Sequence, residues 1–135
     1  MSSIQLNYLA IGVAAIVQFA VSGVWYSVLF ARPWTALVEL TEEKKKQANM
    51  PALFGTAFLG ELVTCYVLAN VIGFNGSQTF LGGVLTGLFC WLGFAGATSH
   101  ATYMFSGKPH KLWLIDSGNN LVAFMLAGGL LAVWK

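Results

Sequence analysis

Charged side chains are scarce in this sequence. Lys, Arg, Asp and Glu together make up 9% of the 135 residues, whereas a soluble domain carries about 25%. Hydrophobic residues make up 57% of the chain, and the mean hydropathy is +0.71. A chain with so few charges cannot cover a water-facing surface, so we expect lipid to surround it. The length predicts one membrane domain, residues 1–135.

Other absences narrow the possible functions. The formal net charge is only +2, and no clustered basic face is present for a nucleic-acid partner. The two cysteines, Cys65 and Cys90, lie in apolar runs, which is typical of buried small side chains and not of a disulfide framework. No P-loop, G-x-G-x-x-G, H-E-x-x-H or C-x-x-C motif occurs. We therefore predict no enzyme, no cofactor and no metal site.

Four long apolar runs fill most of the chain, at about residues 4–30, 51–74, 79–106 and 111–134. Each exceeds the roughly 20 residues that a helix needs to cross a hydrocarbon core about 30 Å thick. The first run follows MSSIQLN, which has no basic side chain, so we expect a retained anchor and not a removable signal peptide. The runs predict an all-α membrane protein, a bundle of four transmembrane helices.

The only long polar connection is Arg32–Asn49, and it predicts a short interfacial helix in the first loop. Pro33 can open a helix because its missing N–H is not needed there. Thr41 is a predicted N-cap, followed by Glu42 and Glu43 in the first turn and then by three lysines. A solvated helix without a binding role and an anionic-lipid site are both compatible with this pattern. We favour the first, because the two acids offset much of the lysine charge.

The basic residues predict the orientation in the membrane. Four of them lie in the first loop and two in the third, whereas the opposite side holds only Lys135. The positive-inside rule places these loops in the cytoplasm. We therefore expect a multi-pass protein of the cell inner (plasma) membrane, with both termini outside the cytoplasm. The six basic residues are Arg32, Lys44, Lys45, Lys46, Lys108 and Lys111.

Polar side chains interrupt the apolar runs at two neighbouring depths on the side of the basic loops. An ionisable group inside a span costs roughly 2.5–3.5 kcal/mol and usually has a function. We predict a polar cavity open to the cytoplasm, a candidate binding or proton site with Glu61 at its floor. Its members are Glu61, His100, Asp116, Asn120, Ser22, Tyr26 and Gln18.

Each member also has a structural interpretation. Glu61 is either a neutral, protonated hydrogen-bond donor or a proton-carrying or cation-binding group. Asp116 lies near enough to the edge of its span to reach water or Lys111. His100 is more often an interhelical hydrogen-bonding group than a ligand. The amides of the remaining polar residues are typical of hydrogen bonds between helices; these are Gln18, Asn119 and Asn120.

Small residues follow one face of the third apolar run at helical spacing. They include a G-x-x-x-G and predict a helix-packing surface, because small residues let helices approach closely in lipid. The predicted packing residues are Gly83, Gly87, Gly93 and Ala97.

Short aromatic motifs resemble a known family. They are Gly23-Val24-Trp25-Tyr26-Ser27, Thr41-Glu42-Glu43 and Lys111-Leu112-Trp113-Leu114-Ile115. In these motifs, and in spacing over nearly the whole chain, the sequence resembles domain of unknown function family 1761, small four-span bacterial membrane proteins. The resemblance implies the four-span fold and adds no mechanism, because the family has no established activity.

The function predicted from the sequence is that of a non-catalytic subunit or scaffold, which self-associates as a homo-oligomer or docks on a larger membrane complex. The alternative is a small proton- or cation-coupled permease that uses Glu61, helped by His100 and Asp116. A third interpretation, a lipid- or pigment-binding module, depends on four aromatic residues that an interfacial belt also explains: Trp25, Tyr26, Trp91 and Trp113.

Overall fold

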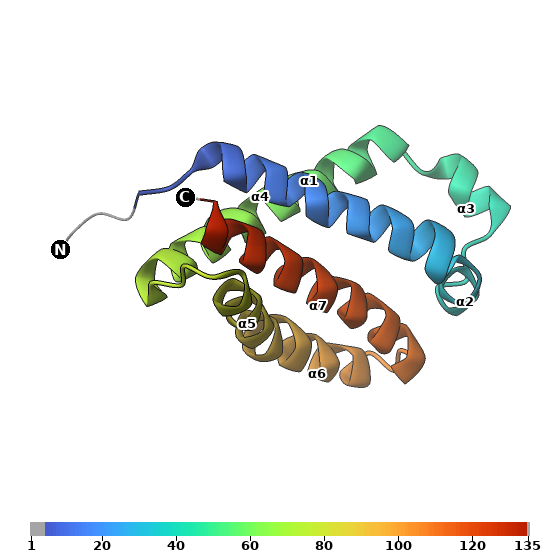
Figure 1. Cartoon of the computed structure of the whole chain (residues 1–135). Helices are drawn as coiled ribbons and strands as arrows, with labels where there is room; N and C mark the ends of the chain where they lie inside the picture. The colour runs from blue at the N-terminus through green and yellow to red at the C-terminus, as the bar shows by residue number, and fades with distance from the viewer. Residues whose placement is uncertain (1–4, 135) are drawn as a thin grey trace.

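The computed structural model describes residues 5–134, and within them every regular element is a helix (Figure 1). The predicted start of the first span at Ile4 and the terminal Lys135 lie outside the described residues. The elements in chain order are α1 (Tyr8–Val24), η1 (Trp25–Leu29), α2 (Ala31–Leu37), α3 (Glu42–Gln47), α4 (Met50–Asn75), α5 (Phe80–Cys90), η2 (Trp91–Gly96), α6 (Ala97–Phe105) and α7 (His110–Val133); η1 and η2 are π-helices.

Four continuous helical stretches are long and apolar enough to cross a membrane: Tyr8–Leu29, Met50–Asn75, Phe80–Phe105 and His110–Val133. At a rise of 1.5 Å per residue, stretches of 22 to 26 residues extend about 33–39 Å, which exceeds a hydrocarbon core of about 30 Å. The predicted all-α, four-helix membrane fold is confirmed, and the protein is a multi-pass membrane protein.

Polar side chains cap the first turn of three helices, and a glycine ends α4. The side chains of Asn7, Asn49 and Thr79 accept hydrogen bonds from the backbone N–H three residues further on, at 3.1, 3.2 and 3.0 Å. These bonds satisfy N–H groups that have no partner within the helix. Gly76 ends α4 with a φ of 72°, a left-handed conformation that glycine adopts without steric cost. The tight turn predicted at Asn75-Gly76 lies at this point.

The first loop contains two short helices, α2 and α3, where one was predicted. Thr41 caps α3, as its Oγ1 accepts from the N–H of Lys44 at 3.1 Å. Pro33 does not open a helix, because α2 begins two residues earlier, at Ala31. Pro33 is the third residue of α2. It still lies within the first turn of the helix, where a missing N–H breaks no hydrogen bond.

α7 is the central helix of the bundle. It packs against α5, α1 and α4, and it runs between α1 and the α5–η2–α6 span (Figure 1). Most of the buried core residues are small, so the helices approach closely, and this is the type of contact that holds helices together in lipid. The main core cluster consists of Ala10, Ile11, Ala14, Ala15, Cys65, Leu68, Ile72, Ala127, Leu131 and Ala132.

α5 and α7 touch through their backbones. A Cβ atom added at Gly83 would overlap the carbonyl of Gly128, and one added at Gly87 would overlap the carbonyl of Phe124. The predicted packing face does not extend further, because Gly93 and Ala97 are exposed. Gly93 lies within the π-helix η2, and Ala97 directly follows it. The wider turn of η2 changes which residues of this span face α7.

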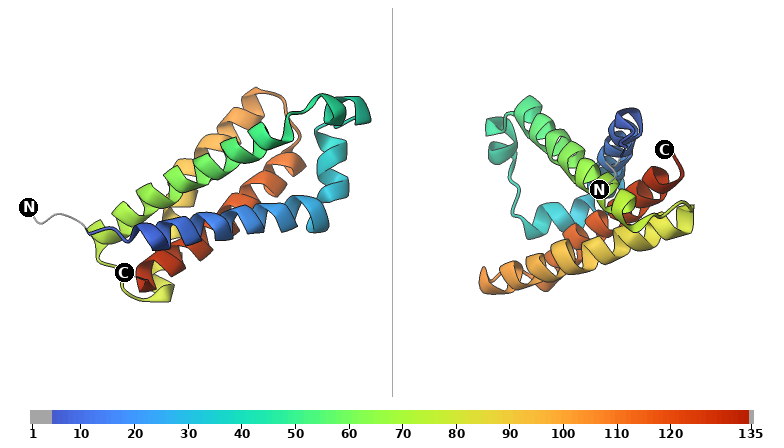
Figure 2. Two further views of the ribbon diagram at one scale, coloured as in Figure 1. Left: turned by 90° about the horizontal axis from the view of Figure 1, so that it is seen from above. Right: turned by 90° about the vertical axis from the view of Figure 1, so that its left-hand side faces the viewer.

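α1 and α4 are packed at one end and diverge toward the α2–α3 end (Figure 2). Where the two helices are still in contact, the buried thiol of Cys65 donates to Oε1 of Gln18 at 3.4 Å. Towards the open end the ring of Phe19 reaches the rings of Phe54 and Phe58, at centroid distances of 5.9 and 6.0 Å. The divergence leaves a wedge between the two helices, and this wedge positions the polar site described below.

Candidate functional site

The carboxylate of Asp116 on α7 is held by two tyrosines from two other spans. The hydroxyl of Tyr26 donates to Oδ1 at 2.7 Å, and that of Tyr103 donates to Oδ2 at 2.6 Å. Because both oxygens accept, the geometry is that of an ionised carboxylate. Of the two contacts expected for Asp116, water or Lys111, the second is absent among the described residues. Residues five apart on a helix do not share a face, and Lys111 is exposed.

Two tryptophans, one from the first span and one from the third, form hydrogen bonds with the same part of α7. The indole N–H of Trp25 donates to the backbone carbonyl of Ile115 at 2.8 Å, and that of Trp91 donates to the carbonyl of Ser117 at 3.0 Å. Each tryptophan is the first residue of a π-helix, and such bulges are frequent at functional sites. We call Ile115, Asp116 and Ser117, with their tyrosine and tryptophan partners, the α7 hub.

Sequence reasoning assigned these tryptophans to a membrane-interface belt and missed their hydrogen bonds. Tyr103 was not singled out at all. Two of the sequence motifs were the available signal, because their residues bind each other. The adjacent residues Trp25-Tyr26 of the first span form hydrogen bonds with the adjacent residues Ile115-Asp116 of the fourth. Both pairs belong to, or directly follow, the stretches on which the family resemblance rests.

His100 lies apart from the other predicted site residues. Its ring contacts the rings of Trp113 and His110, at centroid distances of 4.7 and 5.4 Å. The prediction that it shares a cavity with Glu61 is wrong, because His100 lies against residues at the start of α7 and lines neither cavity that Glu61 lines. Among the described residues, no group of three or more His, Cys, Asp and Glu could hold a metal ion.

Four of the seven predicted residues surround one partly open cavity of about 290 Å³ between α1, α4 and α7. They are Gln18, Ser22, Glu61 and Asn120. Gln18 is the most deeply buried, at 2% exposed. The same cavity is also lined by Ala57, Gly60, Thr64, Ala123 and Phe124. We call it the polar cavity.

A second open cavity of about 350 Å³ also borders Glu61, in the wedge between α1, η1, α2 and α4. We call it the aromatic cavity, because its lining includes Phe19, Tyr26, Trp34 and Phe54. Ser22, Ala57 and Glu61 line both cavities. Tyr26 also binds Asp116, so the aromatic cavity adjoins the α7 hub.

Polar atoms around Glu61 are left without partners. Oε2 of Glu61 and Nε2 of Gln18 are buried and make no hydrogen bond within residues 5–134. Oδ1 of Asn119 is in the same state, while its Nδ2 donates to Oγ of Ser22 at 3.1 Å. Leaving a buried polar atom unsatisfied costs roughly 1–3 kcal/mol, and more for a charged group. One acceptor and one donor beside the same cavity therefore favour a polar occupant there.

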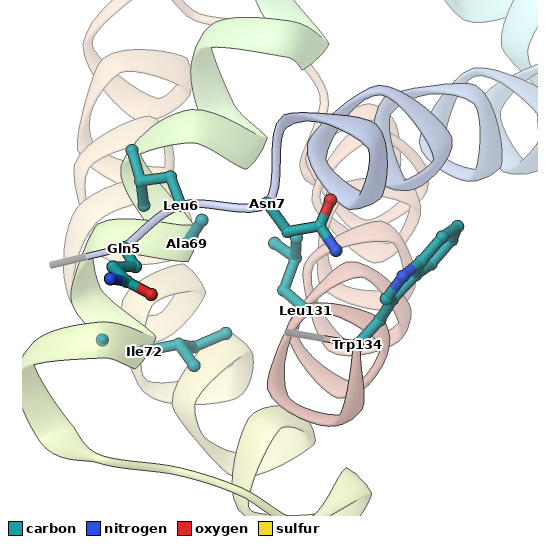
Figure 3. Close-up of a pocket in the computed structure, with 8 residues that line it drawn as sticks. Gln5, Leu6, Asn7, Ala69, Ile72, Leu131 and Trp134 are labelled. Carbon is teal, nitrogen blue, oxygen red and sulfur yellow. The ribbon is translucent and has the colours of Figure 1, made fainter.

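The opposite end of the bundle has a much smaller cavity. Its volume is about 40 Å³, enough for no more than a few water molecules. Figure 3 shows its lining, which comes from the segment before α1 and from the ends of α4 and α7: Gln5, Leu6, Asn7, Ala69, Ile72, Gly73, Leu131 and Trp134. The larger cavities beside Glu61 are therefore the better candidates for a functional site.

Comparison with known proteins agrees with the resemblance found in the sequence. No curated protein and no solved structure matches the chain. A family model described as "Protein of unknown function (DUF1761)" matches residues 9–132, a range that includes the α7 hub and both cavities. The family predicted from the sequence is confirmed, and this chain is a member of the DUF1761 family.

Proposed function

We propose that the protein is a non-catalytic membrane subunit or scaffold, which self-associates or docks on a larger membrane complex. The observation that carries the proposal is the first half of α4. From Met50 to Gly60 every residue except Phe58 is exposed, and the outward side chain of Leu59 is 62% exposed. This half of a spanning helix has few neighbours in its own chain and is free to contact a further helix.

The glycines support the same proposal. Those of α5 and α7 lie in contact inside the bundle, whereas four glycines of α1 and α4 have nothing within 4 Å of the position of a Cβ atom. Small residues in membrane helices favour close approach by another helix. The open positions are therefore consistent with contact outside the chain; they are Gly12, Gly23, Gly55 and Gly60.

Cysteine cross-linking in native membranes tests this proposal. Leu59→Cys is introduced into a chain in which Cys65 and Cys90 are replaced by alanine. Oxidation should give a dimer, or an adduct with a co-purifying protein. Phe94→Cys, at a position that is 80% exposed on η2, is the matched control and should stay monomeric. A monomer at both positions, with no co-purifying protein, would refute the subunit role.

We place the protein in the inner (plasma) membrane with both termini outside the cytoplasm. The first loop, with its three lysines in α3, would then face the cytoplasm. Lys45→Cys, in the same cysteine-free chain, should react with a membrane-impermeant maleimide only after cells are opened. Reaction in intact cells would reverse the proposed orientation.

The second candidate function is a small proton- or cation-coupled permease. The polar cavity supports it, because Gln18, Ser22 and Asn120 line the same space as Glu61. His100 and Asp116, the other predicted helpers, line neither cavity beside Glu61, so the mechanism would depend on Glu61. Proton-driven uptake into liposomes should be lost in Glu61→Gln. Equal flux in wild type and variant would exclude this mechanism.

A further inference from the structure

Glu61 lines two cavities of different chemistry. The polar cavity is lined by amides and hydroxyl groups, and the aromatic cavity is lined mainly by rings. A molecule that fills both spaces needs a polar head and an apolar body. We propose that Glu61 binds the ammonium group of an organic cation, whose apolar body lies against the rings of the aromatic cavity.

The first argument is the missing counter-ion of Glu61. Among the described residues, the one salt bridge joins Lys45 to Glu42 on α3, and no Lys or Arg lies on the same spanning helix as Glu61. Oε2 of Glu61 also accepts no hydrogen bond there. A carboxylate in a membrane protein is normally paired. An ammonium group supplies both the opposite charge and the hydrogen-bond donors.

The second argument is the buried amide of Gln18. This side chain is 2% exposed and lines the polar cavity, and its Nε2 has no acceptor among residues 5–134. Its Oε1 already accepts from Cys65, so the amide is anchored on one side only. A ligand, or a water molecule that accompanies it, would complete the hydrogen bonds of this group.

The third argument is the size and lining of the two cavities. Volumes of about 290 and 350 Å³ far exceed the roughly 30 Å³ that one water molecule takes up, so a bare ion would leave them largely empty. The aromatic lining contains two edge-to-face pairs, Tyr26 with Trp34 and Phe19 with Phe54, at centroid distances of 5.1 and 5.9 Å. Aromatic side chains offer large apolar contact surfaces, which suit the apolar body of such a ligand.

Such a group can come from a free organic cation or from the headgroup of an amine-bearing lipid. Both present an ammonium group together with an apolar part, although in a phospholipid a phosphate separates the two. Binding at equilibrium requires neither a partner protein nor net transport. Its measurement is therefore independent of the cross-linking and flux experiments that test the proposed functions.

Calorimetric titration of the purified full-length protein in detergent tests the proposal. Benzylammonium is the probe, and benzyl alcohol is its neutral analogue of similar shape. We expect benzylammonium to bind, and benzyl alcohol to bind about tenfold more weakly or not at all, as for loss of a charge-assisted hydrogen bond. Glu61→Gln should weaken benzylammonium to a similar extent, whereas Glu43→Gln makes the same chemical change on exposed α3 and should have no effect. Equal binding by wild type and Glu61→Gln would overturn the proposal.

A second variant separates the two cavities. Phe54→Ala removes a ring of the aromatic cavity and should weaken benzylammonium several-fold, while leaving the affinity for methylammonium unchanged. Equal weakening of both probes would contradict the assigned position of the apolar body.

A second measurement needs no variant. Dicyclohexylcarbodiimide modifies carboxyl groups in apolar surroundings, and mass spectrometry reports the modified residue. Benzylammonium should slow modification of Glu61 in the wild-type protein, and an unchanged rate would overturn the proposal. Mass spectrometry of co-purified lipid identifies the source of the ligand. Retained amine-bearing lipid that benzylammonium displaces indicates a headgroup, and benzylammonium binding without such lipid indicates a free solute.

Discussion

Removal of the Asp116 carboxylate should destabilise the bundle measurably, because one side chain joins three of the four spans. Its two hydrogen bonds, of 2.7 and 2.6 Å, are short enough for a charged acceptor, and each such bond contributes about 1.5–3 kcal/mol. Asp116→Asn keeps one carbonyl acceptor but sets an amide N–H₂ against the second tyrosine. We expect a loss of about 2–3 kcal/mol in the free energy of unfolding.

Single changes at the tyrosines divide this effect. Tyr26→Phe or Tyr103→Phe removes one donor and leaves one carboxylate oxygen unpaired, so each should cost about 1.5–2 kcal/mol. Interhelical side-chain hydrogen bonds in a membrane protein average only about 0.6 kcal/mol. A loss above about 1 kcal/mol in the free energy of unfolding therefore distinguishes hydrogen bonds to a charged carboxylate from ordinary polar contacts between helices.

Unfolding by SDS in mixed micelles, followed by circular dichroism, measures these differences. Tyr66→Phe is the control, because Tyr66 is 46% exposed on α4 and its hydroxyl has no partner in the described part of the chain. The double variant Tyr26→Phe with Asp116→Asn should be less destabilised than the sum of the single variants. Additive effects, each below about 0.6 kcal/mol, would show that Asp116 is not a clamp.

Three further substitutions test other parts of the bundle by the same unfolding measurement. Gly87→Ala places a methyl group against the backbone of Phe124 and should cost about 1–3 kcal/mol; an unchanged stability would show that α5 and α7 are not in contact. Trp25→Phe removes the 2.8 Å hydrogen bond to Ile115 and should cost about 0.5–1.5 kcal/mol; no loss would remove the tryptophan from the α7 hub. Gly76→Ala forces a side chain into a φ of 72°, with a cost of about 1–2 kcal/mol; a neutral result would contradict the left-handed end of α4.

The sequence was sufficient to predict what depends on one helix at a time. Apolar runs of more than 20 residues predict spans because lipid gives backbone groups no partner outside a helix. Counting residues at 1.5 Å each places Glu61, Asn120 and Ser22 at similar depth, and the structure has all three beside one cavity. Thr41 as a helix cap depends only on residues within one turn, and it too could be predicted.

Features that depend on two helices at once were not predictable in this way. The two π-helices change which residues face α7, so a stripe extrapolated at constant spacing from Gly83 fails at Gly93 and Ala97. The partners of Asp116 lie 90 and 13 residues away in the chain. Finding them requires knowing which spans neighbour α7 and how each is rotated, and one sequence does not contain that information in local form.

The central position of α7 has a consequence for the order of assembly. It is the fourth span to leave the ribosome, yet α5 packs chiefly on it. α1 and α4 can pair early, through the contact of Gln18 with Cys65. Gly83 and Gly87 of α5, which contact the backbone of α7 in the folded protein, must face lipid until α7 enters the bilayer. Protease resistance of nascent chains should therefore rise in two steps, first for the α1–α4 hairpin and then, after α7 is released, for the remainder.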